Sequence, residues 1–338
     1  MDVYDIDRGF RLVERVSIPE AHPIRGVVVS PQTNALFITV GGRGGETGTG
    51  SLLRLDLRRM RIAWERAFPT GVDSPAITPD GRTLYLPTGE LSTGDSWYVV
   101  QALSGRVIDE IHAGLSPHNT IVGPSGRKVY LGPRNGMYLV VADTKTNRIV
   151  QRIGPLRSGV RPFTIDGHER FAYTTATGFL GFQVSSIATG AVLDTVPISG
   201  FSYDPSTFAP SAPSHGIALS PNNRLLWVID APNSYVHEFD VSHVPTGSPV
   251  SVANVKLSSP MTGDETPCGQ DCARDGWLQE SADGRFLFVG DSGDVVDTRT
   301  QRVVAFLPAL RNSRYQLEVD WRNGQPISTT TRSSIGRP

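Results

Sequence analysis

The sequence predicts an all-β fold built from a repeated unit, because two kinds of sequence pattern, here called phrases, recur along the chain. The first phrase is an apolar stretch, a polar turn and an aromatic-aliphatic stretch, clearest in VVVSPQTNALFITV (27–40), PAITPDGRTLYLPT (75–88), NTIVGPSGRKVYLG (119–132), GIALSPNNRLLWVI (216–229) and LQESADGRFLFVG (278–290). The second phrase is a polar turn between two strand-like stretches, clearest in YLVVADTKTNRIVQRI (138–153), FQVSSIATGAVLDTV (182–196) and VVDTRTQRVVAFL (295–307). One phrase of each kind supplies about four short strands, and a repeat of such units is typical of a β-propeller.

The unit at residues 117–155 shows how the residues favour strands. Stretch 129–131 is rich in β-branched and aromatic residues, and Pro124 and Gly126 belong to the turn before it. Proline presets φ and glycine allows φ above zero, as tight turns require. Residues 148–153 alternate polar and apolar, which is expected of an outer strand with one wet face. Inner strands read as nearly continuous apolar runs, since neighbouring blades cover both of their faces.

First halves of the unit begin at seven places, so we predict a seven-bladed β-propeller with four antiparallel strands per blade, forming a single domain over 1–338. The blades are expected at residues 22–68, 70–113, 115–155, 158–198, 212–257, 274–309, and 311–333 together with 2–18. The seventh copy lacks a second half, and DVYDIDRGFRLVERVSI (2–18) resembles one. We therefore expect strands from both termini to share one blade, which closes the ring and removes an exposed edge.

Two stretches, SHGIALSPNNRLLWVID (214–230) and LVVADTKTNRIVQRI (139–153), carry a family resemblance. They resemble the repeat of the YVTN (YncE-like) family of seven-bladed β-propellers. The resemblance covers essentially the whole chain and implies the fold. It implies no single function, because that family contains binding proteins as well as enzymes, and a fold does not carry a function.

Composition limits the partners and the compartment. The net charge of −1 argues against nucleic acid, and no apolar run approaches the roughly 20 residues that span a bilayer. The only cysteines, Cys268 and Cys272, lie in PCGQDC, where we expect a disulfide that stabilises by roughly 2 kcal/mol. A metal site would need four ligands, and no histidine lies in this loop. A disulfide favours a periplasmic or secreted protein, and we expect a monomer.

The loops predict where a ligand binds. Irregular stretches at 41–50, 89–97, 199–214 and 258–275 fall in two connections: between the second and third strands of a blade, and between successive blades. Both connections emerge on one face of a propeller. Insertions on one face of a repeat array often form the binding face. We call this face the mouth.

The first residues of the innermost strands reach the same mouth. Arg25, Asp73, His118 and His215 occupy one equivalent repeat position. The candidate binding residues are Arg25, Asp73, Asn119, Arg161, Asp275, Trp277 and Arg314. The candidate catalytic residues are His118, His215 and Glu280, and the candidate metal ligands are His118, His215 and His22. The alternative is structural: histidines that cap backbone groups, and Arg–carboxylate pairs between blades.

Three functions remain open from the sequence. The first is an extracytoplasmic propeller that binds a small polar or anionic ligand, or a protein partner, at the mouth. Arginine suits such a ligand because its planar fork of donors fits carboxylates. The second is a metal-assisted lyase or hydrolase acting on a lactone or cyclic ester, with one divalent ion as its candidate cofactor. The third is a subunit of a redox complex, for which no haem motif is present.

Overall fold

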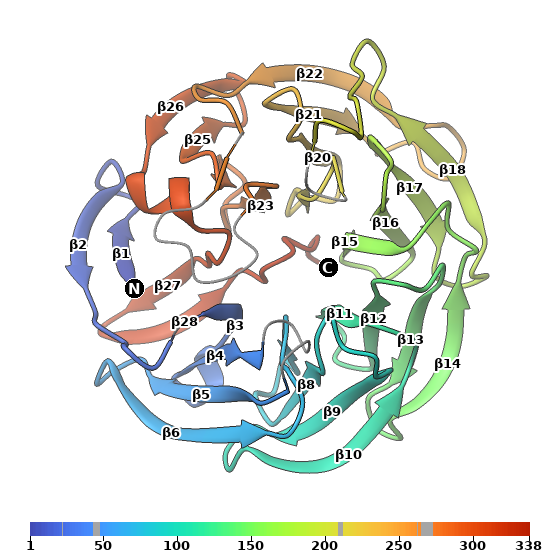
Figure 1. The fold of residues 1–338 in the computed structure, drawn as a ribbon. Helices are drawn as coiled ribbons and strands as arrows, with labels where there is room; N and C mark the ends of the chain where they lie inside the picture. Colours follow the sequence, from blue (N-terminus) through green and yellow to red (C-terminus); the bar gives the residue numbers. More distant parts are fainter. Residues whose placement is uncertain (22, 43–47, 209–211, 262, 265–272) are drawn as a thin grey trace.

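The computed structural model describes residues 1–21, 23–42, 48–208, 212–261, 263–264 and 273–338. The predicted all-β propeller is confirmed: antiparallel sheets follow one another around a centre, with sequence order running around the ring (Figure 1). Among the described residues there are six four-stranded sheets and two two-stranded hairpins. The helices described are two short 3₁₀ turns, η1 (Pro31–Thr33) and η3 (Pro308–Asn312).

Each four-stranded sheet forms one blade, and its strands run outward from the centre in chain order. Blade 1 contains β3 (Ile24–Ser30), β4 (Ala35–Gly41), β5 (Gly50–Asp56) and β6 (Arg61–Phe68). Blade 2 contains β7 (Ala76–Ile77), β8 (Thr83–Pro87), β9 (Ser96–Gln101) and β10 (Arg106–His112). Blade 3 contains β11 (Pro117–Val122), β12 (Lys128–Pro133), β13 (Leu139–Asp143) and β14 (Arg148–Ile153).

The remaining four-stranded blades follow the same order. Blade 4 contains β15 (Val160–Ile165), β16 (Phe171–Ala176), β17 (Gly181–Ser186) and β18 (Val192–Pro197). Blade 5 contains β19 (Ile217–Leu219), β20 (Leu225–Asp230), β21 (Tyr235–Asp240) and β22 (Val250–Lys256). Blade 6 contains β23 (Trp277–Glu280), β24 (Phe286–Gly290), β25 (Asp294–Asp297) and β26 (Arg302–Phe306).

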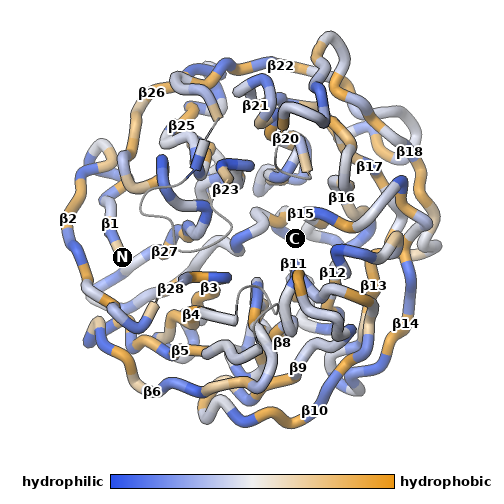
Figure 2. Tube along the Cα trace, viewed as in Figure 1, coloured by the Kyte–Doolittle hydropathy of each residue, from blue (hydrophilic) through white to orange (hydrophobic). Residues whose placement is uncertain are grey.

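The hydrophobic core lies between neighbouring blades, as the apolar inner strands predict. Every residue of β11 and β15 is buried, whereas β14 and β18 alternate between partly buried and exposed positions. Figure 2 shows this mixture of hydrophobic and hydrophilic residues along the outer strands. Across the boundary between blades 4 and 5, the rings of Phe182 and Phe239 meet edge to face at 5.0 Å. Such contacts are the main source of stability in a fold whose blades share no backbone ladder.

The chain termini fill the sector between blades 6 and 1 (Figure 1). They form two hairpins: β1 (Asp2–Asp5) with β2 (Arg11–Arg15), and β27 (Val319–Arg322) with β28 (Gln325–Thr329). No ladder joins these hairpins within the described strands. The expectation that they share one hydrogen-bonded blade is therefore not confirmed.

Side-chain packing attaches each hairpin to a neighbouring blade. Phe10 of the N-terminal hairpin meets Phe286 of blade 6 edge to face, with ring centroids 4.9 Å apart. Tyr315, Leu317 and Val319, at the start of the C-terminal hairpin, pack on the core of blade 1. The N-terminal hairpin thus packs on blade 6 and the C-terminal hairpin on blade 1, the two blades that flank the seventh sector.

The last residues of the chain cross the centre of the ring, which sequence reasoning did not foresee. We call residues 330–338 the central segment; the carboxyl terminus lies at the centre in Figure 1. The backbone oxygen of Ser334 accepts hydrogen bonds from the Leu219 N–H and the Thr164 hydroxyl, both at 2.9 Å. Gly336 N–H donates to the oxygen of Ile165 at 3.0 Å. The segment therefore ties together the innermost strands of blades 4 and 5.

Further contacts extend the central segment to blade 6. The Ser334 hydroxyl oxygen accepts the Glu280 N–H at 2.8 Å, and the Arg332 backbone oxygen accepts the Trp277 indole N–H at 2.6 Å. Buried backbone groups need partners, and these bonds supply them for a segment outside any sheet. The end of the chain thus occupies the centre on which the mouth opens.

Some predictions lie outside the described residues. His22, Cys268 and Cys272 belong to the segments that the structure does not describe, so the expected disulfide stays a prediction.

As to a membrane span, no helix in the described ranges combines the length and the apolar character that crossing a bilayer requires.

Candidate functional site

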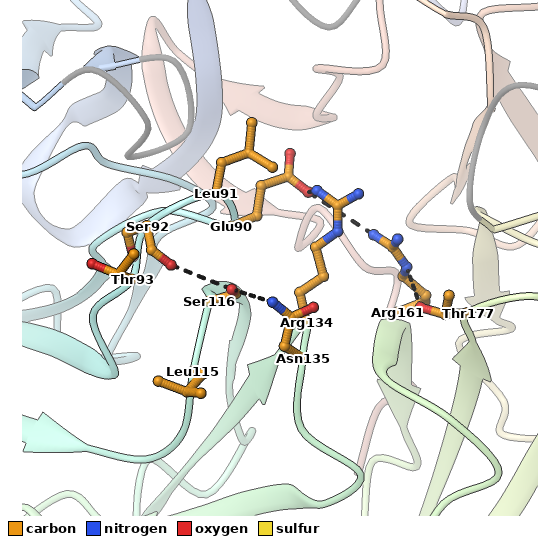
Figure 3. Close-up of a pocket in the computed structure, with 10 residues that line it drawn as sticks. All are labelled: Glu90, Leu91, Ser92, Thr93, Leu115, Ser116, Arg134, Asn135, Arg161 and Thr177. Atoms are coloured by element: carbon orange, nitrogen blue, oxygen red, sulfur yellow. Dashed lines mark hydrogen bonds and ion pairs between the residues drawn. The ribbon is translucent and has the colours of Figure 1, made fainter.

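The mouth contains an open cavity of about 610 Å³ between blades 2, 3 and 4 (Figure 3). It is lined by Glu90, Leu91, Ser92, Thr93, Leu115, Ser116, Arg134, Asn135, Arg161 and Thr177. These residues come from connections between second and third strands, from the connection between blades 2 and 3, and from the start of β15. Apart from Arg161, they therefore come from the two classes of connection expected at the mouth. Of the long loops named from sequence, 89–97 lines this cavity, and the described parts of the other three do not.

Glu90 lies at the centre of the ion pairs beside this cavity. Its Oε1 accepts a hydrogen bond from Arg25 Nη2 at 2.5 Å, and its Oε2 accepts one from Arg134 Nη1 at 2.6 Å. Arg161 Nη1 lies 3.9 Å from the same Oε2. Burial by itself raises the pKa of this carboxyl, but His118 and the guanidinium groups outweigh it and hold the pKa well below its usual range. Glu90 is therefore ionised at neutral pH.

Asp73 forms the second anionic position, in contact with two of the predicted residues. Its Oδ2 lies 3.1 Å from Arg25 Nη2 and 3.1 Å from His118 Nδ1. Burial opposes ionisation of Asp73, yet the charges of His118 and Arg25 hold its pKa below the usual value. Burial likewise works against the charge on Arg25, but Asp73 and Glu90 raise the pKa of its guanidinium well above the ordinary value. Arg25, Asp73 and His118 are thus brought together, as equivalent repeat positions predict.

A divalent metal ion would find three candidate donor residues here. Ligand atoms of Asp73, Glu90 and His118 lie within 4.8 Å of one another. However, Arg25 Nη2 contacts both carboxylates. A cation bound between them would have to displace this guanidinium and would lie near that of Arg134 as well. As arranged, the three residues fit a salt-bridge network better than a metal.

His215 belongs to a separate cluster with different partners. Its Nδ1 donates to the backbone oxygen of Gly276 at 3.0 Å and lies 3.3 Å from Asp275 Oδ1. Arg314 Nη1 contacts the same Asp275 oxygen at 2.5 Å. Burial, and then the charges of Arg314 and Arg161, lower the pKa of His215 well below its usual value. A neutral imidazole held in this way is suited to accept a hydrogen bond at Nε2.

Trp277, one of the candidate binding residues, stacks in the structure on the chain's own Arg332. The guanidinium carbon of Arg332 lies 3.8 Å from the indole centroid and 4.8 Å from the ring centroid of Tyr315. Arg332 also donates to the Ser74 hydroxyl. Burial, aided by the charges of Arg314 and Arg25, lowers its pKa to about 10. The central segment therefore places a buried guanidinium beside Trp277, Tyr315 and Ser74.

The remaining predicted residues lie apart from the cavity wall. Asn119 is buried on β11, and among the residues that the structure describes neither its amide oxygen nor its amide nitrogen has a hydrogen-bond partner. Glu280 ends β23 beside the turn at 281–285. Burial and the neighbouring Glu238 and Asp283 raise its pKa well above the ordinary value. Its electrostatic neighbours therefore differ from those of His118 and Asp73.

Sequence reasoning missed Glu90, Arg134 and Arg332. Glu90 and Arg134 lie in connections between second and third strands, where the repeat prescribes no residue type. The available signal was the irregular loop 89–97, which was assigned to the mouth without a role for Glu90. Arg332 follows the last strand, where the repeat had ended.

No family model and no curated protein matches this sequence. Among solved structures, the chain is similar to hydrazine synthase of Kuenenia stuttgartiensis, with a TM-score of 0.60 and 20% identity, covering 81% of this chain and 76% of that one. It is also similar to the β-propeller domain of Cps50 (Swd1) from Myceliophteria thermophila, with a TM-score of 0.63 and 11% identity, covering 84% and 86%. At such identities the likeness shows the β-propeller fold alone. Membership of the YVTN repeat family stays an expectation.

Proposed function

We propose that this protein binds a small anionic ligand in the cavity at the mouth. The observation that carries the proposal is that two guanidinium groups, those of Arg134 and Arg161, line one open cavity. A guanidinium presents a planar fork of donors that fits carboxylate and phosphate groups. Ligand cavities commonly combine a few placed polar groups with apolar walls.

The side chains that would contact the ligand are held in place, which supports binding without large rearrangement. Arg161 Nε donates to the Thr177 hydroxyl at 2.9 Å, and Arg134 is held by Glu90. Asn135 Nδ2 donates to the Ser116 hydroxyl at 2.7 Å. Groups that are ordered before binding lose less entropy when the ligand arrives.

The described charges favour an anion over a cation. Three guanidinium groups, those of Arg25, Arg134 and Arg161, act on Glu90. Asp73 adds a second carboxylate. The described groups therefore sum to a positive charge, and a positive potential attracts anions.

A binding titration tests this function. Acetate, succinate and inorganic phosphate would be titrated at constant ionic strength into the wild type and into Arg134→Gln and Arg161→Gln, with heat or NMR shifts as the readout. We expect at least one anion to bind the wild type and each substitution to weaken it about tenfold or more, as loss of a charged hydrogen bond implies. Arg82→Gln is the matched control, because that side chain is 84% exposed and lies away from the cavity. Absence of binding, or equal binding by all variants, would overturn the proposal.

A second candidate, a metal-assisted lyase or hydrolase, has one observation in its favour: the close approach of Asp73, Glu90 and His118. Metal analysis of the purified protein, followed by calorimetry with Mn²⁺ and Zn²⁺, separates it from the first. A stoichiometric ion lost in His118→Ala would favour the metal-assisted function. The contacts of Arg25 with both carboxylates lead us to expect none.

We also propose an extracytoplasmic location, which depends on the predicted Cys268–Cys272 disulfide. Thiol titration of the denatured, unreduced protein should detect no free thiol. Two free thiols would remove the reason for this location.

A further inference from the structure

The cavity has two chemically different sides. In Figure 3 the side chains of Leu91 and Leu115 lie on one side, and those of Arg134 and Arg161 lie on the other. Leu91 is 42% exposed and Leu115 is 56% exposed. Ser92, Thr93 and Ser116 lie between the two leucines, and Asn135 lies beside Arg134. The Glu90 carboxylate also lines the cavity, next to Leu91, and accepts a hydrogen bond from Arg134.

A single exposed leucine on a protein surface needs no explanation. Here two leucines come from different connections, the loop after β8 and the connection between β10 and β11, and both line the same cavity. Exposed apolar surface within a ligand cavity gains free energy when an apolar group covers it. The two guanidinium groups across the cavity can hold an anion at the same time.

We propose that the ligand is an amphipathic organic anion: a carboxylate on a short aliphatic chain. The carboxylate contacts Arg134 and Arg161, and the chain covers Leu91 and Leu115. A cavity of about 610 Å³ has room for such a molecule and is much larger than an inorganic anion needs. This inference rests on the proposed function and specifies the class of its ligand.

The test is a chain-length series. Acetate, butyrate, hexanoate and octanoate are titrated calorimetrically at constant ionic strength, with hexanol as the probe that lacks a charge. Affinity should rise about two- to fourfold for each added methylene until the apolar side is covered. Hexanol should bind at least tenfold more weakly than hexanoate.

The variants separate the two sides of the cavity. In Leu91→Ser/Leu115→Ser the affinity for acetate should be unchanged, while the gain per methylene should disappear. In Arg134→Gln all the carboxylates should weaken by a similar factor. Leu103→Ser is the matched control, since Leu103 is 74% exposed and does not line the cavity, so its series should equal that of the wild type.

Each result decides one of the claims. If acetate binds through Arg134 but chain length has no effect, the amphipathic ligand is wrong and anion binding stands. If the gain per methylene survives in the double leucine variant, the apolar side has been misplaced and the inference is overturned. If no anion in the series or in the phosphate titration binds, the proposed function fails and this inference fails with it.

Discussion

Arg25 Nη2 lies 2.5 Å from Glu90 Oε1, and this contact joins blade 1 to the loop of blade 2 that lines the cavity. Both side chains are more than nine-tenths buried. Removing one partner of such a pair leaves the other charge buried and uncompensated. Glu90→Gln should therefore lower the free energy of unfolding by about 3–5 kcal/mol, measured by urea denaturation. Arg82→Gln at an exposed pair should change it by less than about 1 kcal/mol. Equal losses in the two variants would remove the structural role of Glu90.

Acid should weaken the same network. The folded pKa of Glu90 lies well below its usual value, because the surrounding positive groups outweigh burial. Its contribution is therefore present above the unfolded pKa of about 4.3 and is lost as the pH falls through the folded pKa. We expect the wild type to lose stability below about pH 4 more steeply than Glu90→Gln. Parallel unfolding curves of the two proteins between pH 5 and 2.5 would contradict this.

Glu238 should give the opposite dependence on pH. Burial raises its pKa to about 7, although Gln301 donates to its carboxylate at 2.7 Å. The folded protein thus favours the protonated acid, and this contribution, complete below the unfolded pKa, is lost as the pH rises towards and beyond 7. Glu238→Gln cannot ionise, so its stability relative to the wild type should increase on the order of 1–3 kcal/mol between pH 5 and 8. Thermal unfolding at several pH values measures the difference, and a constant offset would contradict it.

The central segment should contribute to the stability of the ring. Arg332→Ala removes the stacking on Trp277 and the bond to Ser74, and we expect a loss of about 1–3 kcal/mol in unfolding experiments. Arg337→Ala is the control, because the bonds of Arg337 to Pro221 and Asn223 use backbone atoms that alanine keeps. If Arg332→Ala unfolds like the wild type, the segment lies in the centre without stabilising it.

The N-terminal hairpin should also contribute to the stability of the ring, through its packing on blade 6. Phe10 contacts Phe286 at 4.9 Å and Phe288 at 6.1 Å between ring centroids. Phe10→Ala should lower the free energy of unfolding by about 2–4 kcal/mol, and deletion of residues 1–18 should lower it further. Val13→Ala is a control on the same hairpin, with a side chain that is 48% exposed. A deletion variant as stable as the full chain would show that the hairpin is dispensable.

The fold could be predicted from sequence because each blade repeats the same physical pattern. Apolar inner strands such as β11 and alternating outer strands such as β14 gave the blade boundaries. The convergence of Arg25, Asp73 and His118 followed from equivalent positions in a radial repeat. The positions of residues outside the repeat could not be predicted in this way.

Those other residues define much of the candidate site. Glu90 and Arg134 lie in loops whose conformation depends on their contacts with neighbouring blades. The position of Arg332 depends on where the chain runs after β28, and no repeat position specifies it. The repeat pattern therefore predicts which inner-strand residues lie at the mouth. The loop residues that line the cavity can be identified only from the three-dimensional structure.

Crystals grown with 4-bromobutyrate would test the central claim most directly, because anomalous scattering locates the bromine independently of the protein. The account predicts a carboxylate in contact with Arg134 and Arg161, with the bromine peak between Leu91 and Leu115. A bromine beside the guanidinium groups, or a cavity without the ligand at concentrations that saturate binding in solution, would contradict it.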